Sequence, residues 1–347
     1  MKLLICTQAI DKNHPILGFF HAWVEEFSKH FEEVHVICLV KGEYSLPEHV
    51  HVYSLGKEEG ENKIKYLFRF YKYFSKFFFK VHVDFVFFHM GAIYNILGAP
   101  FFFLRKIYKT KFYWWKTHGH IDLAGRVALL FVDTVYTGSK ESFPVKTKKV
   151  RVVGSAVDIG LFTSSEEKRD ITILFVGRIS PIKNVDQVIK ITKCLKDLGI
   201  NVKTRIVGNT PDKAYAESLY KLCDTLELNS EIAFVGARTQ EQLVGEYQRA
   251  LISVNPSDTD SFDKVAIEAM ACESILLSSN ETFRSMLEPY GLYVEKGKID
   301  SYVEKICSIL DMSLEQQQHL TSTLHSFVRE HFSLTTLPER IFYFKSF

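Results

Sequence analysis

The chain has 347 residues, of which 46% are hydrophobic and 24% are charged, a globular composition that excludes a disordered protein. This length favours two domains over a single core. The net charge of +2 is unevenly divided, because residues 1–160 carry 22 Lys and Arg against 15 Asp and Glu. The basic first part indicates an anionic surface as partner.

The six cysteines form no C-x-x-C pair and have no His at zinc spacing. We therefore expect buried free thiols in a reducing, cytoplasmic compartment. The first ten residues hold an apolar run too short for a signal peptide, and it fits a strand better. No apolar run reaches 18 residues, so the sequence predicts no membrane-spanning helix.

In the first part of the chain, short apolar runs rich in β-branched residues alternate with segments of helical period. The predicted strands are residues 3–7, 34–40, 50–55, 84–89, 112–117, 134–137 and 150–153. The predicted helices between them include residues 16–31, 63–80 and 93–108. Strands that are apolar on both faces and alternate with helices predict a parallel sheet covered on both sides.

The second part repeats this plan after a polar stretch at residues 163–170. Its predicted strands are residues 172–176, 202–207, 232–235, 251–255 and 274–278, and its predicted helices are 185–198, 213–226, 240–249 and 264–271. The fold class is thus α/β, with two Rossmann-like doubly wound parallel-sheet domains facing each other across a cleft. We assign residues 1–160 and 161–330 to these domains and expect a C-terminal helix within 331–347 to pack back on the first.

The stretch FVGRISPIKNV, residues 175–185, brings a glycine and two cations to the end of a predicted strand. Gly177 lets backbone approach a ligand, while Arg178 and Lys183 stand near the start of the next helix. A planar guanidinium, an ammonium and a helix N-terminus together suit a diphosphate. The alternative is a solvated turn with two surface cations.

A second stretch, DSFDKVAIEAMA at residues 260–271, places Asp260 in a loop and Glu268 on the helix that follows. Glu268 falls on the apolar face of that helix, where a carboxylate needs a partner. A ribose diol would suit it, and Asp260 would then reach the sugar end of the same ligand. The alternatives are a structural Lys or Arg beside Glu268 and a plain turn role for Asp260.

Together these two stretches resemble the retaining family-4 glycosyltransferases of the GT-B fold, which carry G-R-x4-K and later E-S-F-G-x4-E-A-M-A. The resemblance covers nearly all of the second domain. Weaker similarity appears at GSAVDIGLF, residues 154–162, and at WWKTHGH, residues 114–120.

The resemblance implies a role for each matching position. Arg178 and Lys183 would hold the donor diphosphate, Glu268 the ribose and Asp260 the donor sugar. His118 would lie over that sugar and the acceptor. The remaining donor-side positions implied are Gly18, Gly177, Arg238 near the base, Phe262 and Lys264.

The sequence departs from the family at several of these positions. Asp260 is one methylene shorter than the usual Glu, and Asp263 replaces a glycine whose backbone lies against phosphate. An Asp there is expected to cap the helix and compete with the anion for its N–H groups, with Lys264 supplying a compensating cation. Ala156 and Glu273 also replace family glycines.

The activity implied is transfer of a hexose from a nucleotide-diphosphate sugar, with retention at the anomeric carbon, in cell-envelope polysaccharide or glycolipid synthesis. The nucleotide sugar is the co-substrate, and neither a cofactor nor a metal is expected. Arg178, Lys183 and a helix dipole would neutralise the leaving diphosphate.

Residues 63–80 predict a basic amphipathic helix, with Lys65, Arg69, Lys72 and Lys76 on one side and aromatic residues on another. This pattern suits peripheral binding to an anionic membrane, here the inner face of the cytoplasmic membrane, with a glycan or lipid-linked acceptor. The alternative is a core-packing helix with a solvated charged face.

Two other functions remain open: a sugar-nucleotide epimerase on this fold, and a non-catalytic relative that binds nucleotide sugar or glycan. The chain lacks both G-x-G-x-x-G after its first strand and G-x-x-x-x-G-K-[ST], which disfavours a dehydrogenase and a P-loop enzyme. No recognised nucleic-acid module accompanies the basic part, so no nucleic-acid partner is expected.

Overall fold

The computed structural model describes residues 1–14, 16–117, 119–165, 169–259 and 261–342. The chain divides into two compact units. The first combines Met1–Ser155 with the segment that begins at Leu334, and the second is Ala156–Ser333. The sequence pattern places the corresponding boundaries after residues 160 and 330.

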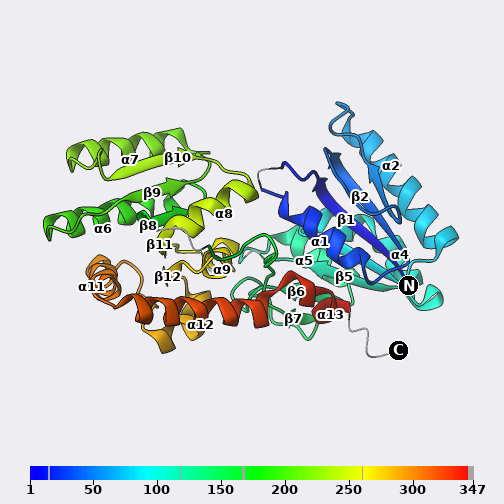
Figure 1. Cartoon of the computed structure of the whole chain (residues 1–347). Coiled ribbons are helices and arrows are strands. Elements are labelled where there is room, and N and C mark those ends of the chain that lie inside the picture. Colours follow the sequence, from blue (N-terminus) through cyan, green and yellow to red (C-terminus); the bar gives the residue numbers. More distant parts are fainter. Residues whose placement is uncertain (15, 118, 166–168, 260, 343–347) are drawn as a thin grey trace. The chain divides into compact units, whose positions relative to one another are not determined.

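The first unit is built on a seven-stranded parallel sheet, as predicted (Figure 1). Its strand order is β3-β2-β1-β4-β5-β6-β7. The strands are β1 Lys2–Ile10, β2 Glu33–Lys41, β3 Val50–Ser54, β4 Phe85–His89, β5 Lys111–Trp115, β6 Thr134–Thr137 and β7 Val150–Val152. The order reverses between β1 and β4, which makes this point of the carboxyl edge a natural place for a ligand.

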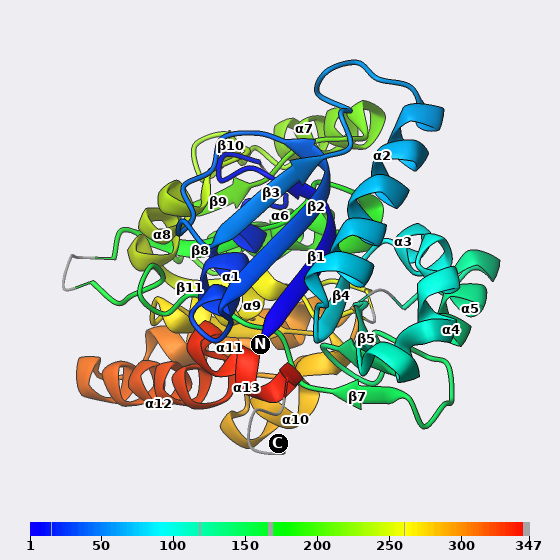
Figure 2. The same ribbon diagram turned by 90° about the vertical axis from the view of Figure 1, so that its right-hand side faces the viewer.

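Helices cover both faces of this sheet. One face packs against α1 (Phe19–Ser28) and α13 (Leu337–Phe342), where Phe342 contacts Phe27 and Phe85 at ring-centroid distances of 5.3 and 5.4 Å. The other face is covered by α2 (Lys63–Ser75), the π-helix η1 (Lys76–Val81), α3 (Ala92–Leu97), α4 (Ala99–Tyr108), α5 (Leu123–Ala128) and the 3₁₀ turn η2 (Leu129–Phe131), and Figure 2 shows α2 to α5 on that side.

Two predicted helices of this unit are interrupted. The segment 93–108 forms two helices that meet at Gly98, because Pro100 fits the first turn of α4 and cannot continue α3. A Cβ at Gly98 would lie 2.9 Å from the Phe88 ring, so the break also lets this segment approach the sheet. After Ser75 the segment 63–80 widens from an α-helix into the π-helix η1, which is followed by the left-handed His82.

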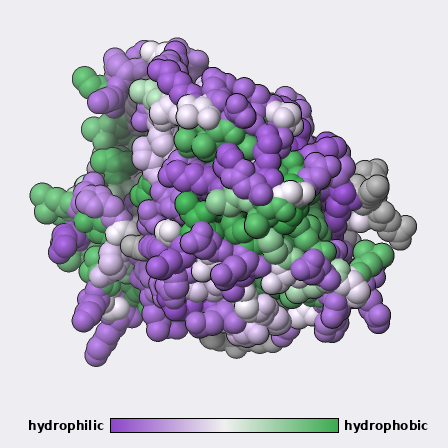
Figure 3. Space-filling model, turned by 90° about the vertical axis from the view of Figure 1, so that its left-hand side faces the viewer, coloured by the Kyte–Doolittle hydropathy of each residue, from purple (hydrophilic) through white to green (hydrophobic). Residues whose placement is uncertain are grey.

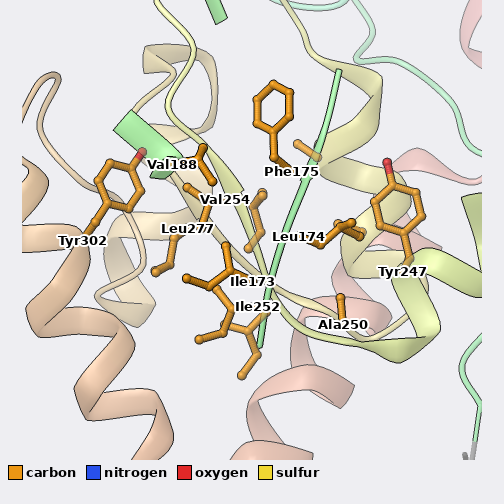
Figure 4. Close-up of a cluster of buried hydrophobic side chains, with 14 of the residues drawn as sticks. Ile173, Leu174, Phe175, Val188, Tyr247, Ala250, Ile252, Val254, Leu277 and Tyr302 are labelled. Atoms are coloured by element: carbon orange, nitrogen blue, oxygen red, sulfur yellow. The ribbon is translucent and has the colours of Figure 1, made fainter. Parts of the chain in front are cut away.

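The second unit contains a five-stranded parallel sheet of order β10-β9-β8-β11-β12. Its strands are β8 Ile171–Val176, β9 Thr204–Val207, β10 Ile232–Gly236, β11 Ala250–Asn255 and β12 Ile275–Ser278. Figure 4 shows Ile173, Ile252 and Leu277 from neighbouring strands in one buried cluster. Here the order reverses between β8 and β11.

The helices of this unit are α6 Val185–Asp197, α7 Lys213–Thr225, α8 Gln240–Arg249, α9 Lys264–Ala271, α10 Arg284–Leu287, α11 Ile299–Leu310 and α12 Leu314–Phe332, with 3₁₀ turns η3 Pro181–Lys183, η4 Glu281–Phe283 and η5 Glu288–Tyr290. The turn η6, Leu334–Thr336, returns the chain to the first unit. The face in Figure 3, on the side of α6, α7 and α11 in Figure 1, is mainly hydrophilic with apolar groups among the polar ones.

Candidate donor site in the second unit

Three glycines shape the carboxyl edge of the second sheet. Gly177, Gly208 and Gly236 stand at the ends of β8, β9 and β10, and a Cβ at Gly208 would lie 1.7 Å from the Gly177 carbonyl oxygen. The Gly208 N–H donates to the Gly236 carbonyl at 2.9 Å. The strand ends therefore meet as bare backbone beside the point where the strand order reverses, which is where open α/β sheets bind ligands.

Lys183 lies at this edge, at the end of η3, and the residue is 9% exposed. Its Nζ contacts Asp263 Oδ1 at 2.7 Å, so the predicted diphosphate cation is already paired within the chain. Asp263 precedes α9, yet its side chain makes no cap hydrogen bond to that helix. The expectation that Asp263 caps α9 is thus wrong, because its carboxylate is turned toward Lys183.

The second Asp263 oxygen is held by three neutral donors. Asn255 Nδ2, Thr259 Oγ1 and Asn280 Nδ2 lie 3.2, 3.3 and 3.5 Å from Oδ2. Asn255 ends β11, and Asn280 follows β12 and is fully buried. A buried carboxylate requires such partners, and this one has a cation and three donors.

Glu268 lies on the second turn of α9 and is 1% exposed. Its Oε1 contacts Lys264 Nζ at 2.5 Å, and the Tyr247 hydroxyl donates to Oε2 at 3.3 Å. The sequence left open whether a ribose or a structural cation meets Glu268, and in the structure Lys264 does. Burial, and then the neighbouring Glu268 carboxylate, raise the pKa of the Tyr247 phenol well above its usual range.

The other predicted donor residues of this unit differ in their surroundings. Arg178 follows β8 and is exposed, and within the described ranges no ion pair or hydrogen bond engages its guanidinium. Arg238 follows β10, with Nε 3.6 Å from Glu246 Oε1, a carboxylate that Arg205 also grips through two 2.7 Å hydrogen bonds. Phe262 packs against Phe283 and Phe332 at 5.0 and 5.3 Å, which anchors the loop before α9 to the core.

The structure therefore brings Lys183, at the end of η3, to Asp263 at the start of α9, whose first two turns carry Lys264 and Glu268. Sequence reasoning missed Tyr247, Asn255 and Asn280, which complete this polar network. Asn255 ends a predicted strand at the reversal of strand order, a signal that would have found it. Asp260 and His118 lie outside the described residues, so their predicted roles stay predictions.

Gly18 lies in the first unit, just ahead of α1. A Cβ there would lie 2.8 Å from the carbonyl oxygens of both Lys12 and His14. The loop's own backbone thus explains why this position is glycine, and the donor role of Gly18 stays a prediction.

The predicted basic helix exists as α2, but its apolar side is divided. Phe70 and Phe74 are buried in the core, whereas Ile64 and Phe68 are 79% and 72% exposed. The prediction of a single aromatic stripe beside the cations is therefore only partly right.

The cations of α2 have neighbours of their own. Lys65 contacts Glu61 at 2.7 Å, and Arg69 contacts Glu59 at 2.8 Å. Lys72 and Lys76 instead lie over aromatic rings. Among the described residues, no helix is both long and apolar enough to cross a membrane.

Comparisons with known proteins identify this architecture. Over almost its whole length the chain is similar to the Anabaena HepE protein solved with UDP-glucose, with TM-score 0.75 and 16% identity, covering 100% of this chain and 99% of that one. A sucrose-phosphate synthase from Thermosynechococcus elongatus gives TM-score 0.76 and 16% identity, covering 97% and 96%. The fold is therefore the GT-B fold of glycosyltransferases, as the motifs indicated.

The family-model match lies within the second unit. Residues 161–323 match the family described as glycosyl transferases group 1. The D-inositol 3-phosphate glycosyltransferase of Mycolicibacterium smegmatis is 31% identical over 136 residues, which are 36% of this chain and 30% of that protein. The protein of the same name from Mycobacterium sp. (strain KMS) is 29% identical over 136 residues, which again are 36% of this chain and 30% of that protein. The chain thus spans about 30% of the length of the curated relatives it matches.

Proposed function

We propose that this protein transfers a hexose from a nucleotide-diphosphate sugar to a glycan or lipid-linked acceptor, with retention at the anomeric carbon. The observation that carries the proposal is the pair of ionic contacts at the start of α9, where Lys183 meets Asp263 and Glu268 meets Lys264. These contacts lie in the part of the chain that matches the glycosyl transferases group 1 family. The second unit binds the donor, and the first unit serves the acceptor. The UDP-glucose complex of the structurally similar HepE supports a donor of this class.

The chemistry that this site supplies is charge neutralisation. Breaking the bond between the sugar and the diphosphate places growing negative charge on the leaving group. Arg178 and Lys183 provide two cations at the carboxyl end of β8, and the N-terminus of α9 adds the positive end of its dipole. Glu268 accepts hydrogen bonds from the ribose, while His118 and Asp260 keep the proposed roles at the transferred sugar.

A thermal-shift screen of nucleotide sugars, followed by the Glu268→Ala variant on the best binder, tests this proposal. We expect the best nucleotide sugar to raise the melting temperature of the natural protein and to lose that effect in the variant. Glu288→Ala, at an exposed glutamate of the same unit, is the matched control. Stabilisation that survives Glu268→Ala would rule out the ribose assignment.

We also propose that the reaction needs no metal ion, because the two cations supply the charge that a metal would supply. Turnover should therefore be unchanged by excess EDTA. A loss of activity that Mg²⁺ or Mn²⁺ restores would contradict this.

The two other candidate functions separate in the same assays. An epimerase would convert the donor alone into a second nucleotide sugar, whereas a transferase releases nucleoside diphosphate only when an acceptor is present. A non-catalytic relative would bind the donor and release nothing with any acceptor. The observation that favours a binding-only protein is that Lys183 and Glu268 both already contact oppositely charged residues of the chain.

We further propose that the first unit docks on the anionic inner face of the cytoplasmic membrane, in cell-envelope polysaccharide or glycolipid synthesis. Residues 63–121 contain eleven Lys and Arg and a single acid, Asp84. The helices that cover one sheet face also expose large apolar side chains at Ile64, Phe68, Phe103, Ile107, Leu123 and Leu130, each more than half exposed. Apolar side chains among cations suit the interface of an anionic bilayer.

Vesicle co-sedimentation tests this docking. The protein should bind vesicles containing phosphatidylglycerol and not those of phosphatidylcholine alone. The double change Phe103→Ser and Ile107→Ser should abolish binding, whereas Leu198→Ser, at a leucine 62% exposed in the second unit, should not. Equal binding by both variants would contradict the proposed face.

A further inference from the structure

Two of the charged groups proposed to bind the donor, Lys183 and Glu268, already have counter-ions, and these come from two adjacent residues. Asp263 pairs with Lys183 at 2.7 Å, and Lys264 pairs with Glu268 at 2.5 Å. Lys183 is the cation proposed for the diphosphate, and Glu268 is the carboxylate proposed for the ribose. Residues 263–264 thus place a carboxylate beside the proposed diphosphate cation and an ammonium beside the proposed ribose carboxylate.

The Asp263 carboxylate is fixed where it stands. Its Oδ1 meets Lys183, and its Oδ2 lies within reach of Asn255, Thr259 and Asn280. It is 9% exposed, and rotating it away would take this acceptor from the buried Asn255 amide. It therefore remains as a negative charge in the site whether or not a ligand is bound.

We propose that Asp263 and Lys264 are internal counter-ions that weaken and set donor affinity, so that donor binding is an exchange of ionic partners. The inference rests on the proposed function. In the free protein, Lys183 and Glu268 are held in ion pairs. A bound diphosphate then shares the Lys183 ammonium with the fixed Asp263 carboxylate, and the ribose displaces Lys264 from Glu268.

The sign of the effect follows from charge. An ammonium has three N–H donors, and Asp263 takes one, which leaves donors for a phosphate oxygen. The carboxylate nevertheless repels the diphosphate, and a water-poor site screens that repulsion less than bulk water does. A residue of the same shape without the charge should therefore strengthen diphosphate binding and leave binding of the bare nucleoside unchanged.

Isothermal titration of the full chain with UDP, GDP and ADP, and with their nucleosides, measures this. Asp263→Asn keeps an oxygen acceptor for the network and removes the charge, so we expect the dissociation constant of the preferred diphosphate to fall about tenfold with no change for its nucleoside. Lys264→Met should strengthen nucleoside binding, by about threefold, because Glu268 is released. Lys183→Met should lose the diphosphate contribution.

The outcomes separate the inference from the function. If the natural protein binds a diphosphate and Asp263→Asn binds it no more tightly, the inference is overturned but the donor site stands. Weaker binding by Asp263→Asn would show that Asp263 positions Lys183 for the diphosphate. If neither the natural protein nor any variant binds a diphosphate, the proposed function itself fails. If Asp263→Asn does not fold, the same titrations are made with Asp263→Gly, since glycine is usual at this position in the family that the sequence resembles.

Discussion

At the scale of single residues, burial decides which charged groups have partners. Glu268 and Asp263 are both nearly buried, and each contacts a lysine. From the sequence one can predict that a Glu on the apolar face of α9 needs a partner, but not which one, because Lys264 and a ribose satisfy it equally well. The partner of Asp263 lies 80 residues away on η3, and only the fold brings the two together.

His89 offers a test of burial through pH. The ring is 1% exposed, stacks on Phe20 at 3.8 Å and is hydrogen-bonded at Nδ1 to the Thr7 hydroxyl. Burial lowers its pKa to about 3, so the folded protein holds His89 neutral where the unfolded chain becomes protonated below its ordinary pKa of 6.5. The unfolding free energy should therefore fall as pH falls from about 6.5 toward 3.

Replacing the ring should remove that dependence. Between pH 7 and pH 5, His89→Phe should gain about 2 kcal/mol of stability relative to the natural protein, measured by urea unfolding followed by tryptophan fluorescence. The exposed His120 is the control site, and its replacement by Phe should leave the pH slope unchanged. If the unfolding free energy of His89→Phe depends on pH as strongly as that of the natural protein, the His89 ring is not held neutral.

At the scale of elements, the alternation of apolar strands and periodic helices predicts the sheet core well. All twelve predicted strands occur at or near the predicted residues, because runs such as residues 34–40 are largely apolar on both faces and are bounded by polar residues. The misses are helix interruptions. Periodicity continues through residues 93–108, and Pro100 is the sequence signal for a break that the prediction passed over. The close approach of Gly98 to Phe88 is visible only in the fold.

The glycine edge of the second sheet gives a prediction at this scale. Gly208→Ala should destabilise the unit by several kcal/mol or prevent folding, because a Cβ would overlap the Gly177 carbonyl and the residue has φ +159°. Gly245→Ala, in α8 with open space around it, should instead stabilise by about 0.5–1 kcal/mol. Urea unfolding followed by circular dichroism measures both. A tolerated Gly208→Ala would mean that the two strand ends are not packed backbone to backbone.

At the scale of the whole molecule, the chain crosses between its units twice. It leaves the first unit after Ser155 and returns after Ser333, so the last helix belongs to the first unit although it follows the second in sequence. Nothing in the local pattern of residues 331–347 marks this return, because a six-residue helix with an apolar side could pack on either core. What fixes it is the set of long-range contacts, such as the Tyr136 hydroxyl donating to the Ile341 carbonyl at 2.5 Å.

Phe342 should therefore stabilise the first unit alone. Its ring is fully buried among Phe27, Phe31 and Phe85, so Phe342→Ala should cost the first unit about 3–5 kcal/mol.

All three tryptophans, Trp23, Trp114 and Trp115, lie in the first unit, so tryptophan fluorescence reports the unfolding of that unit separately. Val328→Ala, at a fully buried position of α12 in the second unit, is the matched change. We expect Phe342→Ala to lower the urea midpoint of the fluorescence transition, and Val328→Ala to lower only the remaining circular-dichroism transition. If both variants shift both transitions equally, the two units unfold as one. The expectation that α13 stabilises the first unit alone would then be wrong.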